Sequence, residues 1–187
     1  HSIDDYAESV KDTTVSIGAI TEGLLETIET DSLEETSMEI AERLTALANM
    51  MMGYQSLQDG NHEECVRRFT ATLKITERID VTFDRSETAH AAIAICKGML
   101  GQRAEEQQHY EKAIAINPDY SVAYYGLGNH FYDTEQYAEA REFYDSALEK
   151  SYIDPLATDE TVGRIHGAIG NLAYIDDDFE GAIDAYN

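Results

Sequence analysis

Three short patterns in this sequence have residue types and spacings that could do chemistry. Residues 126–131 read Gly-x-Gly-x-x-Phe, which imitates a dinucleotide-binding loop. Glu106-x-x-His109 has the spacing of half a di-iron carboxylate site. The triplet Asp176–Asp178 supplies three adjacent carboxylates, the kind of ligand that attracts a calcium ion.

Each pattern lacks the partners that its chemistry requires. The glycine segment follows no predicted strand and has no third glycine, so we expect these glycines to pack helices. A di-iron site needs a second Glu-x-x-His copy and two further glutamates, so we expect an exposed helical face at Glu106 and His109. The aspartate triplet lacks the rest of a calcium loop and is expected to be a solvated turn. The sequence therefore predicts no catalytic residue, no cofactor and no metal site.

Charge and composition exclude several classes of partner. The 187 residues include 13 Lys and Arg against 37 Asp and Glu, a formal net charge of −24. Such a chain repels phosphates, which excludes nucleic acid and anionic membrane surfaces. No apolar run approaches the roughly 20 residues of a membrane span, so we expect no direct membrane insertion. Cys65 and Cys96 are too few for a disulfide-rich secreted scaffold, and we expect two buried thiols and a cytoplasmic location.

Lysine is scarce among the basic residues: five Lys accompany 16 Asp and 21 Glu. This balance is typical of a salt-adapted, halophilic surface, because concentrated salt screens the repulsion between carboxylates. An ordinary acidic cytosolic protein is the alternative interpretation.

Self-similarity along the chain indicates how the elements are arranged. An apolar residue followed by Gly or Ala recurs, and a turn lies seven residues after each small residue. The small residues are Gly53, Ala94, Gly128 and Gly170, and the turns are Gly60, Gly101, Glu135 and Asp177. Successive small residues are 41, 34 and 42 positions apart, close to the period of a helix–turn–helix repeat.

The third unit carries the clearest motif. It reads Tyr124-x-x-Leu127-Gly128-x-x-Phe131 and then Tyr137-x-x-Ala140-x-x-x-Tyr144-x-x-Ala147. On these residues the chain resembles the tetratricopeptide repeat (TPR) family from about residue 45 to the end. The fourth unit matches well, whereas the first two are degenerate. In the second, Glu106 replaces a small buried residue and His90 replaces a large aromatic one.

The resemblance implies an all-α fold, a superhelical solenoid of TPR-type helix–turn–helix units. It also implies that the first helix of each unit lines a concave groove in which peptides bind. The predicted groove residues are Tyr125, Asn129, Tyr132, Arg164, Asn171 and Tyr174. Asn129 and Asn171 each follow a packing glycine, and an amide at that position can bond a peptide backbone whatever its sequence.

The predicted function is a protein-interaction scaffold that binds a peptide segment of a partner protein. Arg164 is the single cation among the six predicted residues, so a neutral-to-basic or apolar segment fits better than an acidic one. A second interpretation is a TPR-type chaperone for an exported or aggregation-prone client, because small acidic repeat proteins of secretion systems look similar. A fragment of an enzyme or signal receptor is the third, and self-association is open as well.

Before residue 45 the repeat pattern gives way to apolar residues spaced by seven, such as Ile3, Val10 and Ile17. We expect residues 1–44 to form a helical hairpin that caps about four repeats in residues 45–187, the last of them truncated. A signalling coiled coil is the alternative, although three heptads are few for one.

Two of the three repeat offsets exceed 34 residues by about two helical turns. The extra residues fall at 76–86 and 151–160. One added turn on each neighbouring helix would preserve the stacking. Pro155 allows an ordinary longer loop in the second case.

The acidic surface predicts that the protein becomes more stable as salt is added. Repulsion between carboxylates is screened over about 10 Å at 0.1 M ionic strength and over about 3 Å at 1 M. Thermal unfolding midpoints in about 0.1 M and about 2 M NaCl should rise with salt, and KCl should act nearly as well. A flat or falling midpoint would contradict the salt-adapted interpretation.

Overall fold

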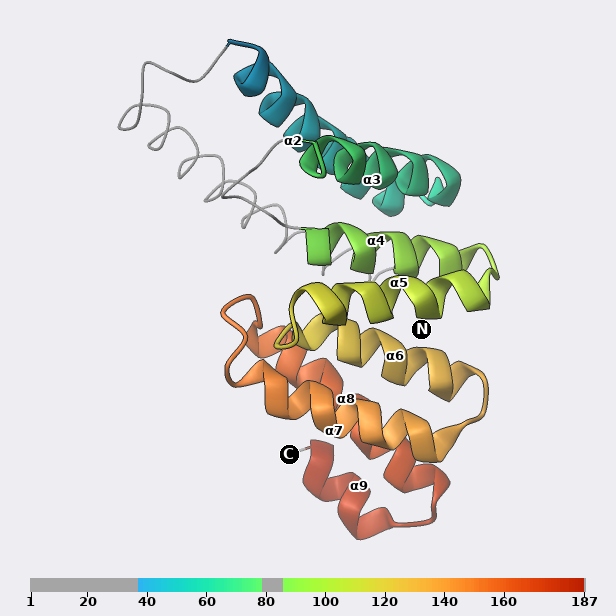
Figure 1. The fold of residues 1–187 in the computed structure, drawn as a ribbon. Coiled ribbons are helices and arrows are strands. Elements are labelled where there is room, and N and C mark those ends of the chain that lie inside the picture. The colour runs from blue at the N-terminus through green and yellow to red at the C-terminus, as the bar shows by residue number, and fades with distance from the viewer. Residues whose placement is uncertain (1–36, 79–85, 187) are drawn as a thin grey trace. The chain divides into compact units, whose positions relative to one another are not determined.

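The computed structural model describes residues 37–78 and 86–186, and each regular element within them is an α-helix (Figure 1). The helices are α2 (Ser37–Gln58), α3 (His62–Thr76), α4 (Ser86–Met99), α5 (Arg103–Ile116), α6 (Ser121–Asp133), α7 (Tyr137–Ser151), α8 (Asp159–Ile175) and α9 (Phe179–Tyr186). They fall into two compact units, one with α2 and α3 and the other with α4 to α9. The predicted all-α fold of helix–turn–helix units is confirmed.

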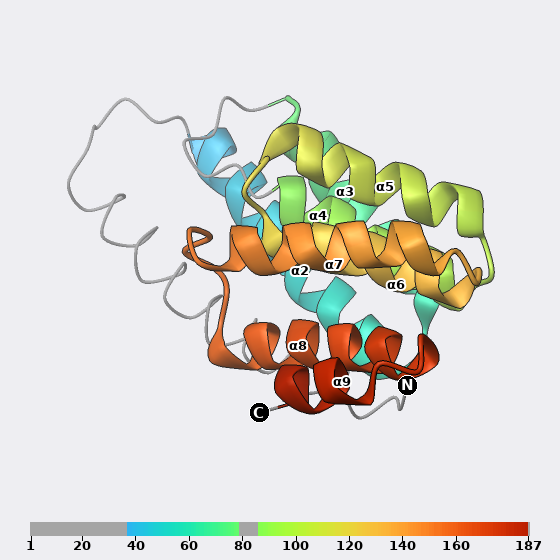
Figure 2. The ribbon, with the colours of Figure 1, turned by 90° about the horizontal axis from the view of Figure 1, so that it is seen from below.

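Consecutive helices form pairs. In the first unit α2 packs on α3, and in the second the pairs are α4–α5, α6–α7 and α8–α9. Figure 2 shows the two helices of the α8–α9 pair running side by side. Within the second unit, α5 packs on α6 and α7 packs on α8, so each pair buries the apolar face of the pair before it.

A small residue on the first helix of a pair lies against an aromatic ring sixteen positions later on the second helix. A Cβ atom added to Gly53 would overlap the ring of Phe69, and one on Gly128 would overlap the ring of Tyr144. These two rings are 0% and 1% exposed. The missing side chain lets the helices approach until the ring fills the space between them, which explains why the small residue recurs.

The turns within the pairs share one backbone conformation. Gly60 and Gly101 have φ of 72°, while Glu135 and Asp177 have φ of 61° and 59°. This left-handed region costs a residue with a Cβ roughly 1–2 kcal/mol, which glycine avoids. All four predicted turn positions are therefore confirmed, and two of them hold a non-glycine residue in a strained conformation.

The connection between α7 and α8 is fixed to the start of α6 by Asp154. One carboxylate oxygen, Oδ2, accepts hydrogen bonds from the N–H (2.9 Å) and the hydroxyl (2.7 Å) of Ser121. The other, Oδ1, accepts from the N–H of Leu156 at 2.9 Å. Asp154 is 5% exposed, and the three bonds compensate for the burial of its charge. The N-cap residue of α6, Tyr120, makes no side-chain capping bond, so Asp154 replaces it in that role.

The extra residues between the third and fourth pairs are divided between a helix and a loop. α8 begins eleven residues before Gly170, whereas α6 begins seven before Gly128, so α8 is longer by about one turn. The remainder lengthens the loop at residues 152–158 and adds one residue to α7. Both of the alternatives that the sequence offered, a lengthened helix and a longer loop, thus contribute. Most of the first lengthened connection, residues 79–85, lies outside the described residues.

α2 runs without interruption through the predicted domain boundary after residue 44. Residues 1–36 lie outside the described part of the chain, so the hairpin and its coiled-coil alternative remain predictions. Cys65 and Cys96 are fully buried as expected, but neither is a free thiol. The expectation of two buried thiols was therefore wrong, and the argument for a reducing compartment that rested on it is lost.

Two glycines on first helices provide a matched test of the packing rule. Gly128→Ala should lower the free energy of unfolding by about 1–3 kcal/mol, because the added methyl group overlaps a buried ring that has no room to move. Gly163→Ala on α8 should raise it by about 0.5–1 kcal/mol, because nothing lies within 4 Å of the new Cβ and alanine favours the helix. Urea unfolding of both variants measures the difference. Equal effects would show that the contact does not limit the approach of α6 and α7.

Candidate functional site

The six predicted groove residues lie on the first helices of the last two pairs. Tyr125, Asn129 and Tyr132 are on α6, and Arg164, Asn171 and Tyr174 are on α8. Each asparagine follows its packing glycine, so both occupy the same position of successive repeats.

The two asparagines share one hydrogen-bonding arrangement. The hydroxyl of Tyr144 donates to Oδ1 of Asn129 at 2.7 Å, and the hydroxyl of Tyr186 donates to Oδ1 of Asn171 at 2.7 Å. The carbonyl end of each amide is therefore held by the second helix of its own pair. Within residues 37–78 and 86–186, neither amide nitrogen has a hydrogen-bond partner, so each side chain keeps two N–H donors for a ligand.

A second feature also repeats between the two pairs. The rings of Tyr132 and Tyr137 meet edge to face at 5.6 Å, and those of Tyr174 and Phe179 do so at 5.7 Å. Tyr132 is partly buried against the apolar cluster that α7 and α8 share, whereas Tyr174 is 63% exposed. The aromatic residues of the predicted groove are thus held by neighbouring rings, which lowers the entropy cost of using them in binding.

Arg164 is not a free cation. Its guanidinium pairs with the carboxylate of Glu160, one turn earlier on α8. The pair is neutral as a whole, so the predicted residues present hydrogen-bond donors and aromatic surface with little positive charge.

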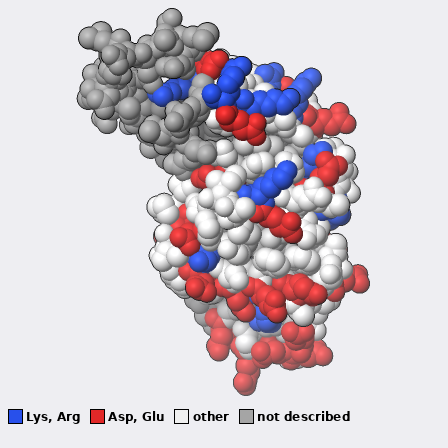
Figure 3. Space-filling view, viewed as in Figure 1, with Lys and Arg blue, Asp and Glu red and all other residues white. Residues whose placement is uncertain are grey.

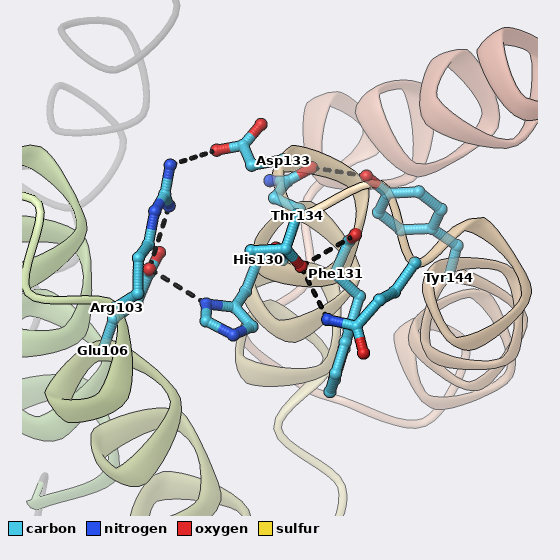
Figure 4. Close-up of polar contacts among 9 residues, drawn as sticks. Arg103, Glu106, His130, Phe131, Asp133, Thr134 and Tyr144 are labelled. Carbon is cyan, nitrogen blue, oxygen red and sulfur yellow. Dashed lines mark hydrogen bonds and ion pairs between the residues drawn. The ribbon is translucent and has the colours of Figure 1, made fainter.

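A polar cluster that the sequence did not reveal connects α5 to α6, with Glu106 and His130 buried at its centre (Figure 4). Oε2 of Glu106 lies 3.0 Å from Nδ1 of His130 and accepts from Nη1 of Arg103 at 2.9 Å. Arg103 also donates to Asp133 at 3.0 Å. Partial burial acts to lower the pKa of Arg103, but the hydrogen bonds to both carboxylates outweigh it and leave the pKa raised. The cluster holds α6, and with it Asn129, in a fixed position on α5.

The expectation of an exposed helical face at Glu106 was wrong, since this side chain is 6% exposed. The physical reason is Gly98 on α4. A Cβ atom added to Gly98 would lie 2.8 Å from the carboxylate carbon of Glu106. The glycine therefore makes room at position 106 for a side chain larger than alanine. In the next pair the corresponding residues are Tyr132 on α6 and Ala140 on α7, so there the large side chain is on the first helix and the small one on the second. This exchange of sizes is the signal that could have revealed the buried glutamate.

Two histidines pair between α4 and α5. Nδ1 of His90 lies 2.9 Å from Nδ1 of His109, so one nitrogen donates and the other accepts. Burial, followed by the charges of His90, Lys112 and Lys97, lowers the pKa of His109 from 6.5 to about 4. His90 is thus partly buried and hydrogen-bonded, as expected for a packing position.

No group of three or more His, Cys, Asp and Glu side chains within residues 37–78 and 86–186 is placed to hold a metal ion. None of the helices in these ranges has the length and apolar character needed to cross a membrane.

A tetratricopeptide repeat family model matches residues 100–155, which include α5, α6 and α7. Tetratricopeptide repeat protein 6 of Homo sapiens is 26% identical over 92 residues, which are 49% of this chain and 16% of that protein. The chain therefore spans only a small part of this curated relative. The two matches confirm the resemblance to the tetratricopeptide repeat family.

Solved structures show the same fold. BtubC (BKLC) from P. vanneervenii has a TM-score of 0.64 at 14% identity, covering 98% of this chain and 84% of its own. The first TPR of Spaghetti, solved with the HSP90 peptide SRMEEVD, has a TM-score of 0.53 at 19% identity, covering 70% and 94%. At these identities the likeness extends to the fold alone.

The lowered pKa of His109 predicts a loss of stability in mild acid. The unfolded chain takes up a proton near pH 6.5 and the folded chain only near pH 4, so the contribution of neutral His109 is full above pH 6.5 and is lost as the pH falls toward 4. Half-exposure of the ring reduces the effect to about 1–2 kcal/mol. Urea unfolding of the wild-type chain and of His109→Gln between these pH values measures it. The free energy of unfolding of the wild-type chain, relative to that of the variant, should decrease as the pH is lowered from 6.5 to 4. If the two free energies changed in parallel with pH, the pairing of His90 and His109 would be contradicted.

Proposed function

We propose that this tetratricopeptide-repeat chain is a protein-interaction scaffold that binds an extended peptide segment of a partner protein across α6 and α8. The observation that carries the proposal is the repeated orientation of Asn129 and Asn171. Each amide carbonyl is held by a tyrosine, so each amide nitrogen is left to donate to a ligand.

Donors of this kind suit the backbone of a peptide. An extended chain presents carbonyl oxygens at regular intervals whatever its side chains, and an amide N–H can bond them without reading the sequence. Tyr132 and Tyr174 provide aromatic surface beside the amides, which would contribute contact area at a low entropy cost.

Charge indicates the composition of the segment. The chain carries a net charge of −24, and the guanidinium of Arg164 is already paired with Glu160. An acidic peptide would be repelled, whereas a neutral-to-basic or apolar segment would not. This differs from the first TPR of Spaghetti, whose bound HSP90 peptide SRMEEVD is rich in acidic residues. A capacity for self-association remains part of the proposal.

Replacing both asparagines by aspartate tests the amide donors. Asn129→Asp/Asn171→Asp keeps an oxygen for each tyrosine hydroxyl but removes the N–H groups and places a carboxylate against the peptide carbonyls. The affinity for a partner recovered with the wild-type chain should fall about ten- to a hundredfold, the effect of losing about 1–3 kcal/mol. Titration calorimetry measures the affinity, and the unfolding midpoint should change little.

Two control variants separate the donor effect from charge and orientation. Gln108→Glu/Gln136→Glu adds the same charge away from the two amides and should leave the affinity within about twofold. Tyr144→Phe/Tyr186→Phe releases the amide carbonyls and should weaken binding less than the aspartate variant. Unchanged affinity in a folded aspartate variant would move the binding site away from α6 and α8.

A further inference from the structure

The two histidines that pair between α4 and α5 occupy a fixed position of the repeat. His90 is on the first helix of its pair, and His109 follows 19 residues later on the second. In the first unit Asn49 and Arg68 have the same separation, and Nη1 of the arginine donates to Oδ1 of the asparagine at 3.2 Å. In both pairs, side chains at this spacing meet across the two helices, so the contact between the imidazoles follows from the register of the repeat.

The two remaining pairs carry other residues at this position. Tyr124 and Phe143 occupy it in the pair of α6 and α7, and His166 and Ala185 in the pair of α8 and α9. Among the four helix pairs that the structure describes, the pair of α4 and α5 is therefore the one that places two imidazoles opposite each other.

The atoms that face each other are ring nitrogens, which can act as metal ligands. Nδ1 of His90 lies 2.9 Å from Nδ1 of His109, with the ring centres 5.1 Å apart and the ring planes inclined by 41°. A hydrogen bond between two imidazole nitrogens requires one of them to accept, so at least one ring is neutral and directs a lone pair between the helices. Neutral imidazole is the commonest protein ligand of metal ions, through either ring nitrogen.

The distance between the nitrogens suits an ion that both rings bind. Bonds from a metal ion to an imidazole nitrogen are about 2.0–2.1 Å long, so two nitrogens 2.9 Å apart would make an angle of about 90° at a shared ion. This is the angle between neighbouring ligands in the tetragonal sites of Cu²⁺ and Ni²⁺. The tetrahedral angle that Zn²⁺ prefers needs the nitrogens about 3.3 Å apart. A small rotation of each ring turns both lone pairs toward an ion beside the line that joins the nitrogens.

The charges around the pair permit a cation. Lys112 and Lys97 are the cations whose charges act on His109, and Glu105 is the anion. Nζ of Lys97 is already paired with Oε2 of Glu105 at 2.6 Å, so these two charges largely cancel. Lys112 opposes a metal ion, and the net charge of −24 favours one. Both rings are only partly buried, which leaves further coordination positions to water or to a ligand from a partner.

We propose that His90 and His109 form a chelating site for a divalent transition metal ion, with Cu²⁺ bound more tightly than Ni²⁺ or Zn²⁺. The ring that donates the hydrogen bond moves its proton from Nδ1 to Nε2, so both Nδ1 atoms face the ion and no proton is released. The ion joins α4 to α5. Glu106, which shares the Glu-x-x-His spacing with His109, is not a ligand, because His130 and Arg103 hold its carboxylate (Figure 4). The site is independent of the proposed peptide groove on α6 and α8.

The test titrates the metal ion alone into the full chain, in a buffer that does not bind metals. By calorimetry the wild-type chain should bind one more Cu²⁺ ion tightly than His90→Gln or His109→Gln. In either variant that ion should bind at least about tenfold more weakly, since losing even an outer partner of a metal ligand costs about 10–100-fold. The double variant should bind no more weakly than either single variant, because a chelate needs both rings. Electron paramagnetic resonance of this Cu²⁺ ion should show coupling to two nitrogens.

His166 provides the matched control for the loss of an imidazole. It occupies the repeat position of His90 but faces Ala185, so His166→Gln should leave the Cu²⁺ affinity within about twofold. Mg²⁺ controls for the acidic surface, and Figure 3 shows acidic side chains gathered over the α9 end of the second unit. At equal concentration, Zn²⁺ should raise the thermal unfolding midpoint of the wild-type chain more than Mg²⁺ does, and this difference should disappear in His109→Gln. Unfolding without metal confirms that the variants fold.

Each contrary result overturns the proposal. Equal Cu²⁺ binding by the wild-type chain and by His90→Gln and His109→Gln would place the ion elsewhere. An equally large loss in His166→Gln would mean that single imidazoles bind the ion. Equal shifts of the unfolding midpoint with Mg²⁺ and Zn²⁺ would assign the effect to the acidic surface.

Discussion

The fold depends on one contact, the approach of an aromatic ring to a helix that carries no side chain at the point of contact. Gly53 and Phe69, Gly128 and Tyr144, and Gly170 and Tyr186 make this contact at identical spacing. A methyl group at the glycine would overlap the ring, so the contact fixes the distance between the helices and their register along the axis. In these three described pairs, the contact sets how the side chains beside it meet.

The candidate site follows directly from this contact. The residue after the small one lies beside the edge of the ring, and its type decides what forms there. Asn129 and Asn171 meet tyrosine hydroxyls and become oriented donors. In the first unit Tyr54 instead packs edge to face on Phe69, with ring centres 4.8 Å apart, and no hydroxyl faces it from that ring. Among the described pairs, the polar arrangement therefore belongs to those in which asparagine and tyrosine coincide.

Local spacing made much of this structure predictable. The seven-residue step from Gly53, Ala94, Gly128 and Gly170 to a turn located four left-handed residues, because a helix of fixed pitch must end at a fixed distance from its contact. The pairing of Arg164 with Glu160 was also predictable, since four residues separate them on one helix.

Spacing does not give the direction of a hydroxyl, so the orientation of the asparagine amides was not predictable. Glu106 was missed because its burial depends on a cavity that Gly98 leaves on another helix. Asp154 was missed because its partner is 33 residues away.

Because Ser121 and Asp154 are 33 residues apart, they are synthesised at different times. During synthesis the segment of α6 leaves the ribosome well before Asp154, and the first turn of α6 has no side-chain cap of its own until the later loop arrives. The third pair is thus completed by residues that belong to the connection with the fourth. A polypeptide cut at the end of α7 would contain both helices of that pair and still lack the carboxylate that closes it. The natural boundary for an autonomous fragment therefore lies beyond residue 158, inside what the repeat pattern alone would assign to the next unit.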